Sequence, residues 1–207
     1  MVKVKVCGIT NLEDAMAAVA AGCDALGFVF FKKSPRYIAP EKARAIIAEL
    51  PAGMLKIGIF VNPKEERVRR IARFCKLDLL QFHGQESAKF CRRFKGYKII
   101  KAFRVRDKID LKKILKYQTF AYLFDTFVRS KPGGTGKKFD WGLLRYLKEI
   151  KQLIFLSGGL NAQNVKRAIQ AVRPDWVDVS SSLEVRPGKK DRSKIRKFMR
   201  VINENSA

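Results

Sequence analysis

The sequence is poor in residues that hold metal ions. It contains one histidine, His83, and four cysteines in 207 residues, and no two cysteines form a C-x-x-C pair. Structural zinc sites need cysteines and histidines at short, regular spacing. We therefore expect no metal site, and we interpret Cys23, Cys75 and Cys91 as packed thiols in a reducing compartment.

Long hydrophobic runs and low-complexity tracts are also missing. No apolar stretch approaches the ~20 residues of a membrane-spanning helix. The N-terminus enters a strand-like pattern directly, without the features of a signal peptide. With 47% hydrophobic residues, the chain is typical of globular proteins. We expect one cytoplasmic domain over residues 1–207, with no membrane partner.

Acidic residues are scarce. The chain has 19 acidic and 44 basic residues, which gives a formal net charge of +25. This charge favours a nucleic-acid binder or an enzyme that attracts an anionic substrate, although a salty or hot habitat would also explain it. The basic residues are spread over nearly every predicted helix and form no aromatic-interleaved stripe. We therefore expect no dedicated nucleic-acid partner.

Short apolar runs typical of buried strands alternate with segments typical of helices. The predicted strands cover residues 2–6, 24–30, 55–61, 77–82, 97–103 and 120–124, with two more beginning at Ile154 and Val177. The predicted helices cover 12–21, 41–50, 62–74, 86–94, 111–115, 141–150 and 192–202, and one more opens at Asn161. Eight such units predict an α/β fold, a single parallel eight-stranded (β/α)8 TIM barrel; an open doubly wound sheet is the alternative.

The last two predicted strands both end in small residues. Ser157-Gly-Gly159 follows the seventh strand and Ser180-Ser-Ser182 follows the eighth. Small residues let backbone N–H groups approach a ligand, and a helix N-terminus attracts negative charge. Barrels of this kind commonly hold phosphate after strands seven and eight, so this pair of turns predicts a phosphate site.

The chemistry of such barrels takes place at the carboxyl ends of the strands. A cysteine after the first strand and an aspartate after the sixth suggest a base and an acid on opposite sides of one mouth. The candidate residues at these ends are Cys7, Arg36, Asn62, His83, Arg104, Asp125, Ser157–Gly159 and Asp178–Ser182.

Several motifs at these strand ends resemble those of the phosphoribosylanthranilate isomerases of tryptophan biosynthesis. Together they run in order from residue 5 to residue 191. The motifs are Lys5-Val-Cys-Gly-Ile-Thr10, Gly27-Phe-Val-Phe-Phe-Lys-Lys-Ser-Pro-Arg36, Gly58-Ile-Phe-Val-Asn62, Leu79-Leu-Gln-Phe-His-Gly84, Phe124-Asp-Thr126, Gly133-Gly-Thr-Gly136 with Phe139-Asp-Trp141, Ser157-Gly-Gly-Leu160 with Asn164-Val165, and Asp178-Val-Ser-Ser181 with Glu184 and Pro187-Gly188.

The resemblance implies an Amadori rearrangement of a phosphosugar, N-(5-phosphoribosyl)anthranilate, without cofactor or metal. It implies Cys7 as the general base and Asp125 as the general acid. A cationic or helix-terminal site would lower the pKa of Cys7, whereas desolvation or a like charge would have to raise that of Asp125. Strand alternation lets Lys5 and Cys7 share one face of the strand. The sequence leaves open whether Lys5 acts on the thiol.

The remaining site residues also follow from the resemblance. Arg36 is expected to hold the anthranilate carboxylate, because a guanidinium suits a planar carboxylate. Asp178 is expected to position substrate or catalyst, and His83 to line the mouth or serve structure. The loop over residues 128–138 is a candidate lid. The phosphate is assigned to Gly158, Gly159, Ser180 and Ser181.

Ser182 departs from the family pattern, which has glycine there. If this position requires a positive φ, serine costs about 1 kcal/mol. Other phosphosugar barrels, such as indoleglycerol-phosphate synthase or a histidine-pathway isomerase, are the nearest alternatives, although the first would be expected to carry an N-terminal extension and a catalytic lysine with a glutamate. The oligomeric state is not determined by the sequence, and a homodimer is compatible with it.

Overall fold

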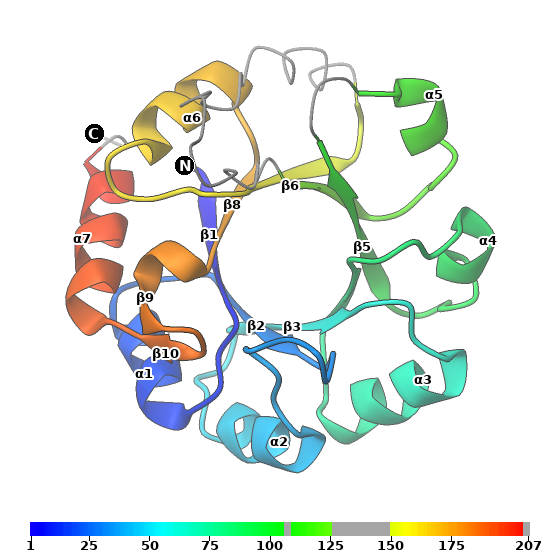
Figure 1. The fold of residues 1–207 in the computed structure, drawn as a ribbon, viewed down its shortest axis with the longest axis horizontal. Coiled ribbons are helices and arrows are strands. Elements are labelled where there is room, and N and C mark those ends of the chain that lie inside the picture. The colour runs from blue at the N-terminus through cyan, green and yellow to red at the C-terminus, as the bar shows by residue number, and fades with distance from the viewer. Residues whose placement is uncertain (106–108, 126–149, 205–207) are drawn as a thin grey trace.

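Eight parallel strands close into a barrel that is surrounded by helices (Figure 1). The computed structural model describes residues 1–105, 109–125 and 150–204. Neighbouring strands pair in sequence order, and the first strand pairs with the last. The strands are β1 (Lys3–Cys7), β2 (Ala25–Val29), β3 (Leu55–Phe60), β4 (Leu79–Phe82), β5 (Lys98–Arg104), β6 (Ala121–Asp125), β7 (Leu153–Ser157) and β8 (Trp176–Val179). The closed barrel is confirmed, and the open sheet is excluded.

The helices lie outside the strands, as the alternating pattern predicts. Among the described residues they are α1 (Leu12–Ala20), α2 (Pro40–Ala48), α3 (Glu65–Phe74), α4 (Ala88–Cys91), α5 (Leu111–Ile114), α6 (Val165–Val172) and α7 (Arg192–Asn203). The predicted helix over 141–150 and the candidate lid over 128–138 fall outside the described residues, apart from residue 150, which has no regular structure.

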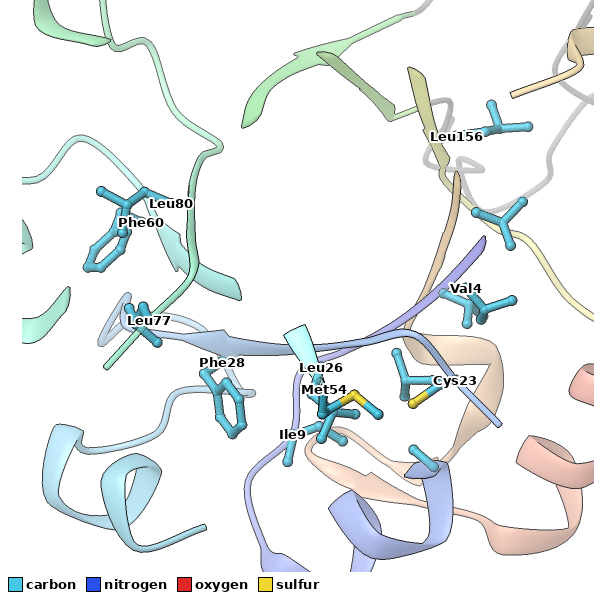
Figure 2. Close-up of a cluster of buried hydrophobic side chains, with 14 of the residues drawn as sticks. Val4, Ile9, Cys23, Leu26, Phe28, Met54, Phe60, Leu77, Leu80 and Leu156 are labelled. Atoms are coloured by element: carbon cyan, nitrogen blue, oxygen red, sulfur yellow. The ribbon is translucent and has the colours of Figure 1, made fainter. Parts of the chain in front are cut away.

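Alternate strand residues face opposite sides of the barrel wall. Outward-facing residues such as Val4, Leu26 and Leu80 pack against the helices in one large apolar cluster. Figure 2 shows part of this layer, with these side chains pointing away from the barrel centre. Inward-facing residues such as Ala25, Leu79 and Leu123 form a second apolar cluster inside the barrel. This inner cluster closes the barrel below the polar residues described next.

Three helices begin later than the sequence predicts, and in two of them, α4 and α6, side chains bond to backbone at or just before the expected first turn. Glu86 accepts hydrogen bonds from Asn62 N and Gly84 N, so α4 begins only after Ser87, whose Oγ accepts from Phe90 N. Asn161 Oδ1 accepts from the backbone amides of residues 163 and 164. This makes a separate turn before α6, and the prediction that the helix opens at Asn161 is wrong.

The start of α3 is also later than predicted. Asn62 has φ 45°, which turns the chain away from helical geometry before Glu65. After β8, a short 3-10 helix, η2 (Ser181–Leu183), leads into a hairpin of β9 (Glu184–Arg186) and β10 (Lys189–Lys190). The sequence pattern did not predict this hairpin. It matters because it brings Glu184 and Lys190 to the mouth of the barrel.

Candidate active site

The predicted base and acid end two strands of the same barrel. Cys7 is the last residue of β1 and Asp125 the last residue of β6. Cys7 follows the inward-facing Lys5 by two positions, and Asp125 follows the inward-facing Leu123 by two positions. Because side chains alternate along a strand, those of Cys7 and Asp125 also face the interior. The parallel strands place them at the same, carboxyl end of the barrel. The sequence expectation for their placement is therefore met.

The Cys7 thiol occupies a niche that depends on Gly27. A methyl group on Gly27 would lie 2.9 Å from Cys7 Sγ, so β2 must carry glycine here. Burial raises the pKa of the Cys7 thiol above its usual value, although the ammonium groups of Lys5 and Lys190 act to lower it. Lys5 and Lys190 do act on the thiol as cations, but the expectation of a lowered pKa for Cys7 is wrong because burial outweighs them.

Lys5 is the centre of a buried polar cluster below Cys7. Its Nζ donates to Gln81 Oε1 over 2.8 Å and to Asp178 Oδ1 over 3.0 Å. Lys5 is completely buried, and burial would lower its pKa, but Asp178 and Cys7 outweigh this effect and raise it. Asp178 faces the interior, as expected, and it holds this ammonium beside the thiol.

His83 lies next to the predicted acid. His83 Nε2 is 3.4 Å from Asp125 Oδ2, and His83 Nδ1 is 3.0 Å from Gln81 Nε2. Both His83 and Asp125 remain partly exposed. His83 thus lines the mouth of the barrel, which is one of the two roles that the sequence analysis considered for it. It also connects Asp125 to the Lys5 cluster.

A cleft of about 910 Å³ opens beside His83. Its lining includes Asn62, His83 and Arg104, three of the residues that the sequence placed at strand ends. Ligand pockets commonly have volumes of several hundred Å³. The cleft therefore leaves room for a small molecule at the carboxyl ends of β3, β4 and β5, and its described lining contains His83 but neither Cys7 nor Asp125.

Arg36 lies at the same mouth, in an ion pair that the sequence did not predict. Its Nε and Nη2 donate to the two carboxylate oxygens of Glu184, over 2.8 Å and 2.6 Å. A Cβ on Gly8, whose φ is 80°, would come within 2.6 Å of Arg36 Cδ, so Gly8 makes room for the side chain. The pair uses two of the five guanidinium N–H donors. The others can still meet a substrate carboxylate.

The two turns predicted to hold phosphate are joined to each other. Gly158 and Gly159 have φ of 98° and 66°, and Ser182 Oγ, from the turn after β8, donates to Leu160 O. Ser180 Oγ donates to Cys7 O over 2.9 Å, which ties the β8 turn to the end of β1. The candidate phosphate turns thus adjoin the Cys7 niche.

Ser182 is not strained in the way its departure from glycine suggested. It lies in η2, and it is not among the described residues with positive φ. Its hydroxyl has a partner in Leu160 O. The strain expected for a positive φ is therefore absent at this described position.

Three polar residues of the mouth had no role in the sequence analysis: Gln81, Glu184 and Lys190. Lys190 is 2% exposed, and its Nζ donates to Glu184 Oε1 over 2.9 Å. Burial lowers the pKa of Lys190, and Glu184 acts in the opposite direction. The only sequence signal was that Gln81 and Glu184 occur within the quoted motifs. No feature of the sequence indicated that Lys190 would be buried.

The described ranges contain neither a cluster of metal-binding side chains nor a membrane-spanning helix. Across residues 1–105, 109–125 and 150–204 there is no group of three or more His, Cys, Asp or Glu side chains placed to hold a metal ion. In the same ranges no helix is long and apolar enough to cross a membrane.

Known proteins share this architecture and sequence along nearly the whole chain. A family model described as N-(5'phosphoribosyl)anthranilate (PRA) isomerase matches residues 4–201. The N-(5'-phosphoribosyl)anthranilate isomerase of Pelobacter propionicus is 48% identical over 204 residues, which are 99% of this chain and 97% of the relative.

Solved structures agree with the sequence matches. The crystal structure of phosphoribosyl anthranilate isomerase from Thermotoga maritima superimposes with a TM-score of 0.92 at 45% identity, covering 99% of this chain and 100% of that one. A phosphoribosyl anthranilate isomerase in complex with reduced 1-(o-carboxyphenylamino)-1-deoxyribulose 5-phosphate gives a TM-score of 0.89 at 43% identity, with coverage of 99% and 100%. The chain therefore belongs to the N-(5'-phosphoribosyl)anthranilate isomerase family and is an isomerase of tryptophan biosynthesis.

Proposed function

We propose that Cys7 is the general base and Asp125 the general acid in the Amadori rearrangement of N-(5'-phosphoribosyl)anthranilate to 1-(2-carboxyphenylamino)-1-deoxyribulose 5-phosphate. The observation that carries this assignment is that both side chains face the interior at the carboxyl end of one barrel. Acid and base groups on two sides of one bound substrate can act on neighbouring atoms in sequence.

The reaction moves two protons without any net change in composition. Asp125 gives its proton to the ring oxygen of the sugar while the bond from that oxygen to C1 breaks. The nitrogen lone pair forms the C=N bond of a Schiff base. Cys7, as thiolate, then removes the proton from C2 and an enolamine forms. This enolamine becomes the ketone as C1 gains a proton from water and the 2-hydroxyl loses one to water. Proton exchange with water then returns Asp125 to its acid form and Cys7 to its thiolate form.

Three cations support the base and the anionic substrate. Lys5 and Lys190 act on the Cys7 thiol and favour its ionised form. Asp178 keeps the Lys5 ammonium in place over 3.0 Å, which gives this aspartate a positioning role. Arg36 binds the anthranilate carboxylate through donors that Glu184 does not use.

The substrate phosphate binds at the turns after β7 and β8. Gly158 and Gly159 carry no side chain of their own, and their positive φ turns the chain at this point, as in backbone turns that bind anions. Ser180 and Ser181 add backbone N–H donors from the second turn, since the hydroxyl proton of Ser180 is already donated to Cys7 O. Support comes from the bond between Ser182 Oγ and Leu160 O, which holds the two turns together.

A homodimer and a cytoplasmic location complete the proposal. A crystal structure of mutually generated monomers of dimeric phosphoribosylanthranilate isomerase from Thermotoga maritima is similar to this chain, at 42% identity and a TM-score of 0.88, and the dimeric parent of those monomers supports the homodimer. The measurement that checks the oligomeric state is sedimentation equilibrium across a range of protein concentrations. The absence of a dedicated nucleic-acid partner remains a prediction.

The assignment of roles is tested by turnover of freshly prepared substrate, followed by the loss of anthranilate-type fluorescence. Cys7→Ala and Asp125→Asn should each lower kcat by about 10²–10⁴-fold, the usual contribution of a general acid or base. Cys75→Ala removes a fully buried thiol elsewhere and serves as the matched control, with unchanged kcat. Wild-type turnover in Cys7→Ala would remove Cys7 from the mechanism.

A further inference from the structure

A hydrogen-bonded chain crosses the barrel from the niche of Cys7 to Asp125. Lys5 Nζ donates to Gln81 Oε1 over 2.8 Å, Gln81 Nε2 lies 3.0 Å from His83 Nδ1, and His83 Nε2 lies 3.4 Å from Asp125 Oδ2. Lys5 and Gln81 are buried, at 0% and 1% exposure. The link between Lys5 and Gln81 is thus shielded from water, which strengthens it.

The chemistry of these groups gives the chain one direction. An ammonium has three donors and no acceptor, so Lys5 must face the amide oxygen of Gln81. The amide NH₂ of Gln81 is then the group that faces His83, and an NH₂ can only donate. His83 Nδ1 must therefore accept. In a neutral imidazole the single proton then sits on Nε2, the nitrogen that faces Asp125.

We propose that Gln81 and His83 are positioning residues for the isomerisation: Gln81, held by Lys5, fixes His83 as the Nε2–H tautomer, which donates to the carboxylate that Asp125 becomes when it gives up its proton. This inference rests on the role of Asp125 in the proposed function. It assigns His83 neither an acid nor a base role.

Asp125 gains a negative charge during the proposed reaction. When this acid protonates the sugar ring oxygen, it becomes a carboxylate at the barrel mouth. A donor that is already aimed at the forming charge stabilises it without reorganisation. The 3.4 Å between His83 Nε2 and Asp125 Oδ2 is long for a hydrogen bond, and catalytic contacts of this kind often tighten in the complex with substrate.

The backbone around His83 is fixed by another buried lysine. Lys101 Nζ donates to Phe82 O over 3.2 Å and to Gly84 O over 2.8 Å, the carbonyls on either side of His83. The same ammonium pairs with Glu86 Oε2 over 2.9 Å. This clip holds the end of β4 in place, so the imidazole can keep its aim at Asp125.

The tautomer can be read directly, because His83 is the only histidine. We would label the untagged full chain with ¹⁵N-histidine and record long-range ¹H–¹⁵N spectra of the imidazole near neutral pH. The expected wild-type spectrum has an unprotonated, pyridine-type Nδ1 and a protonated, pyrrole-type Nε2. An Nδ1–H tautomer or a mixture of both would overturn the proposal.

Gln81→Glu tests the cause of the tautomer. A carboxylate at this place still accepts from Lys5 but has no N–H for His83, so Nδ1 should become protonated. The matched control is Gln118→Glu, the same change at an exposed position, which should leave the spectrum as in wild type. An unchanged spectrum in folded Gln81→Glu would overturn the role of Gln81. If Gln81→Glu does not fold, Gln81→Leu should give a mixture of tautomers, and a single Nε2–H form would overturn it equally.

Steady-state kinetics test whether the Nε2–H group of His83 stabilises the carboxylate of Asp125 during turnover. His83→Leu should lower kcat by about 10- to 100-fold, the worth of one hydrogen bond to a charged group, with little change in KM. His83→Gln keeps an N–H donor and should recover much of this loss. Equal kcat in the two variants would overturn the proposal. Full turnover in Asp125→Asn would instead refute the acid assignment, and the tautomer in the spectrum would be unaffected.

Discussion

Arg36 and Glu184, 148 positions apart in the chain, form an ion pair with two parallel hydrogen bonds at the barrel mouth. Lys190 Nζ donates to the same carboxylate over 2.9 Å. Burial alone would raise the pKa of the Glu184 carboxyl, but Arg36 and Lys190 outweigh burial and hold it below its usual range. Glu184 thereby fixes the plane of the guanidinium that is proposed to bind the substrate carboxylate.

Glu184→Gln should weaken substrate binding more than it slows the chemistry. The amide can keep one hydrogen bond to Arg36 but loses the second, parallel one, so the guanidinium is no longer held in one plane. We expect KM to rise by about 10-fold, which is about 1.4 kcal/mol of binding free energy, with kcat within about 3-fold of wild type. Steady-state kinetics with varied substrate concentration measure both values.

The control for this variant is Glu13→Gln. Glu13 pairs with Lys189 and Arg192 over 2.9 Å on the same side of the barrel, but it is exposed. Exposed pairs are screened by solvent and contribute little, so KM and kcat should match wild type. An equal rise of KM in both variants would show that the general loss of negative charge is responsible, not the orientation of Arg36.

Gly27→Ala should displace the proposed base. The new methyl group would lie 2.9 Å from Cys7 Sγ and 3.1 Å from Cys7 Cα, which is closer than real contacts allow. The thiol must shift, and misplacement of a reacting group by about 1 Å can cost 10²-fold in rate. We expect kcat to fall by about that factor, while circular dichroism shows an intact barrel.

Gly53→Ala separates this effect from loss of stability. Gly53 has φ 87° and no atom within 4 Å of an added Cβ, so the substitution strains the backbone without touching the site. It should cost about 1–2 kcal/mol of unfolding free energy and leave kcat unchanged. A similar loss of kcat in both glycine variants would contradict the steric explanation.

The barrel was predictable because its signals are local. Each strand is a short apolar run, as at 55–61, and each closes on small or polar residues. The inward direction of Cys7 and Asp125 then follows from strand alternation alone. These features need no knowledge of distant residues, and the structure agrees with them.

The wrong sequence predictions concern side chains whose partners or burial depend on the folded chain. Glu86 looks like the start of a helix but is bound to Asn62 N and to Lys101, which no local pattern indicates. Lys190 looks like one more surface lysine, and it is buried because the β9–β10 hairpin places it against Glu184. The raised pKa of Cys7 likewise depends on burial that the sequence does not give.

Cys23 should make the protein less stable as the pH rises. Burial, together with the nearby Asp24, raises the pKa of this thiol to about 12, against ~8.5 in an unfolded chain. Between these values the unfolded state has lost the proton that the native state keeps, so the free energy of unfolding falls with pH. The slope for one thiol is about 1.4 kcal/mol per pH unit.

Urea denaturation of wild type and Cys23→Ala, from pH 8 upward, measures this contribution. The difference between the two slopes isolates Cys23, because other titrating groups are common to both proteins. The free energy of unfolding should fall with pH less steeply in the variant than in wild type. The expected difference between the two slopes is about 1.4 kcal/mol per pH unit. Parallel curves would show that the Cys23 thiol ionises in the folded protein as easily as in the unfolded chain.

Lys101→Met should destabilise the barrel strongly, because it leaves Glu86 without its cation. Both side chains are almost fully buried, at 3% and 2% exposure, and removing one partner of a buried pair typically costs about 3–5 kcal/mol. Lys56→Met is the matched control: Lys56 pairs with Asp78 over 2.9 Å, but the two side chains are 24% and 35% exposed. The control should lose no more than about 1 kcal/mol in urea denaturation. Equal losses would mean that the Lys101 clip contributes no more than a surface pair, and the end of β4 at His83 would then have to be held by other contacts.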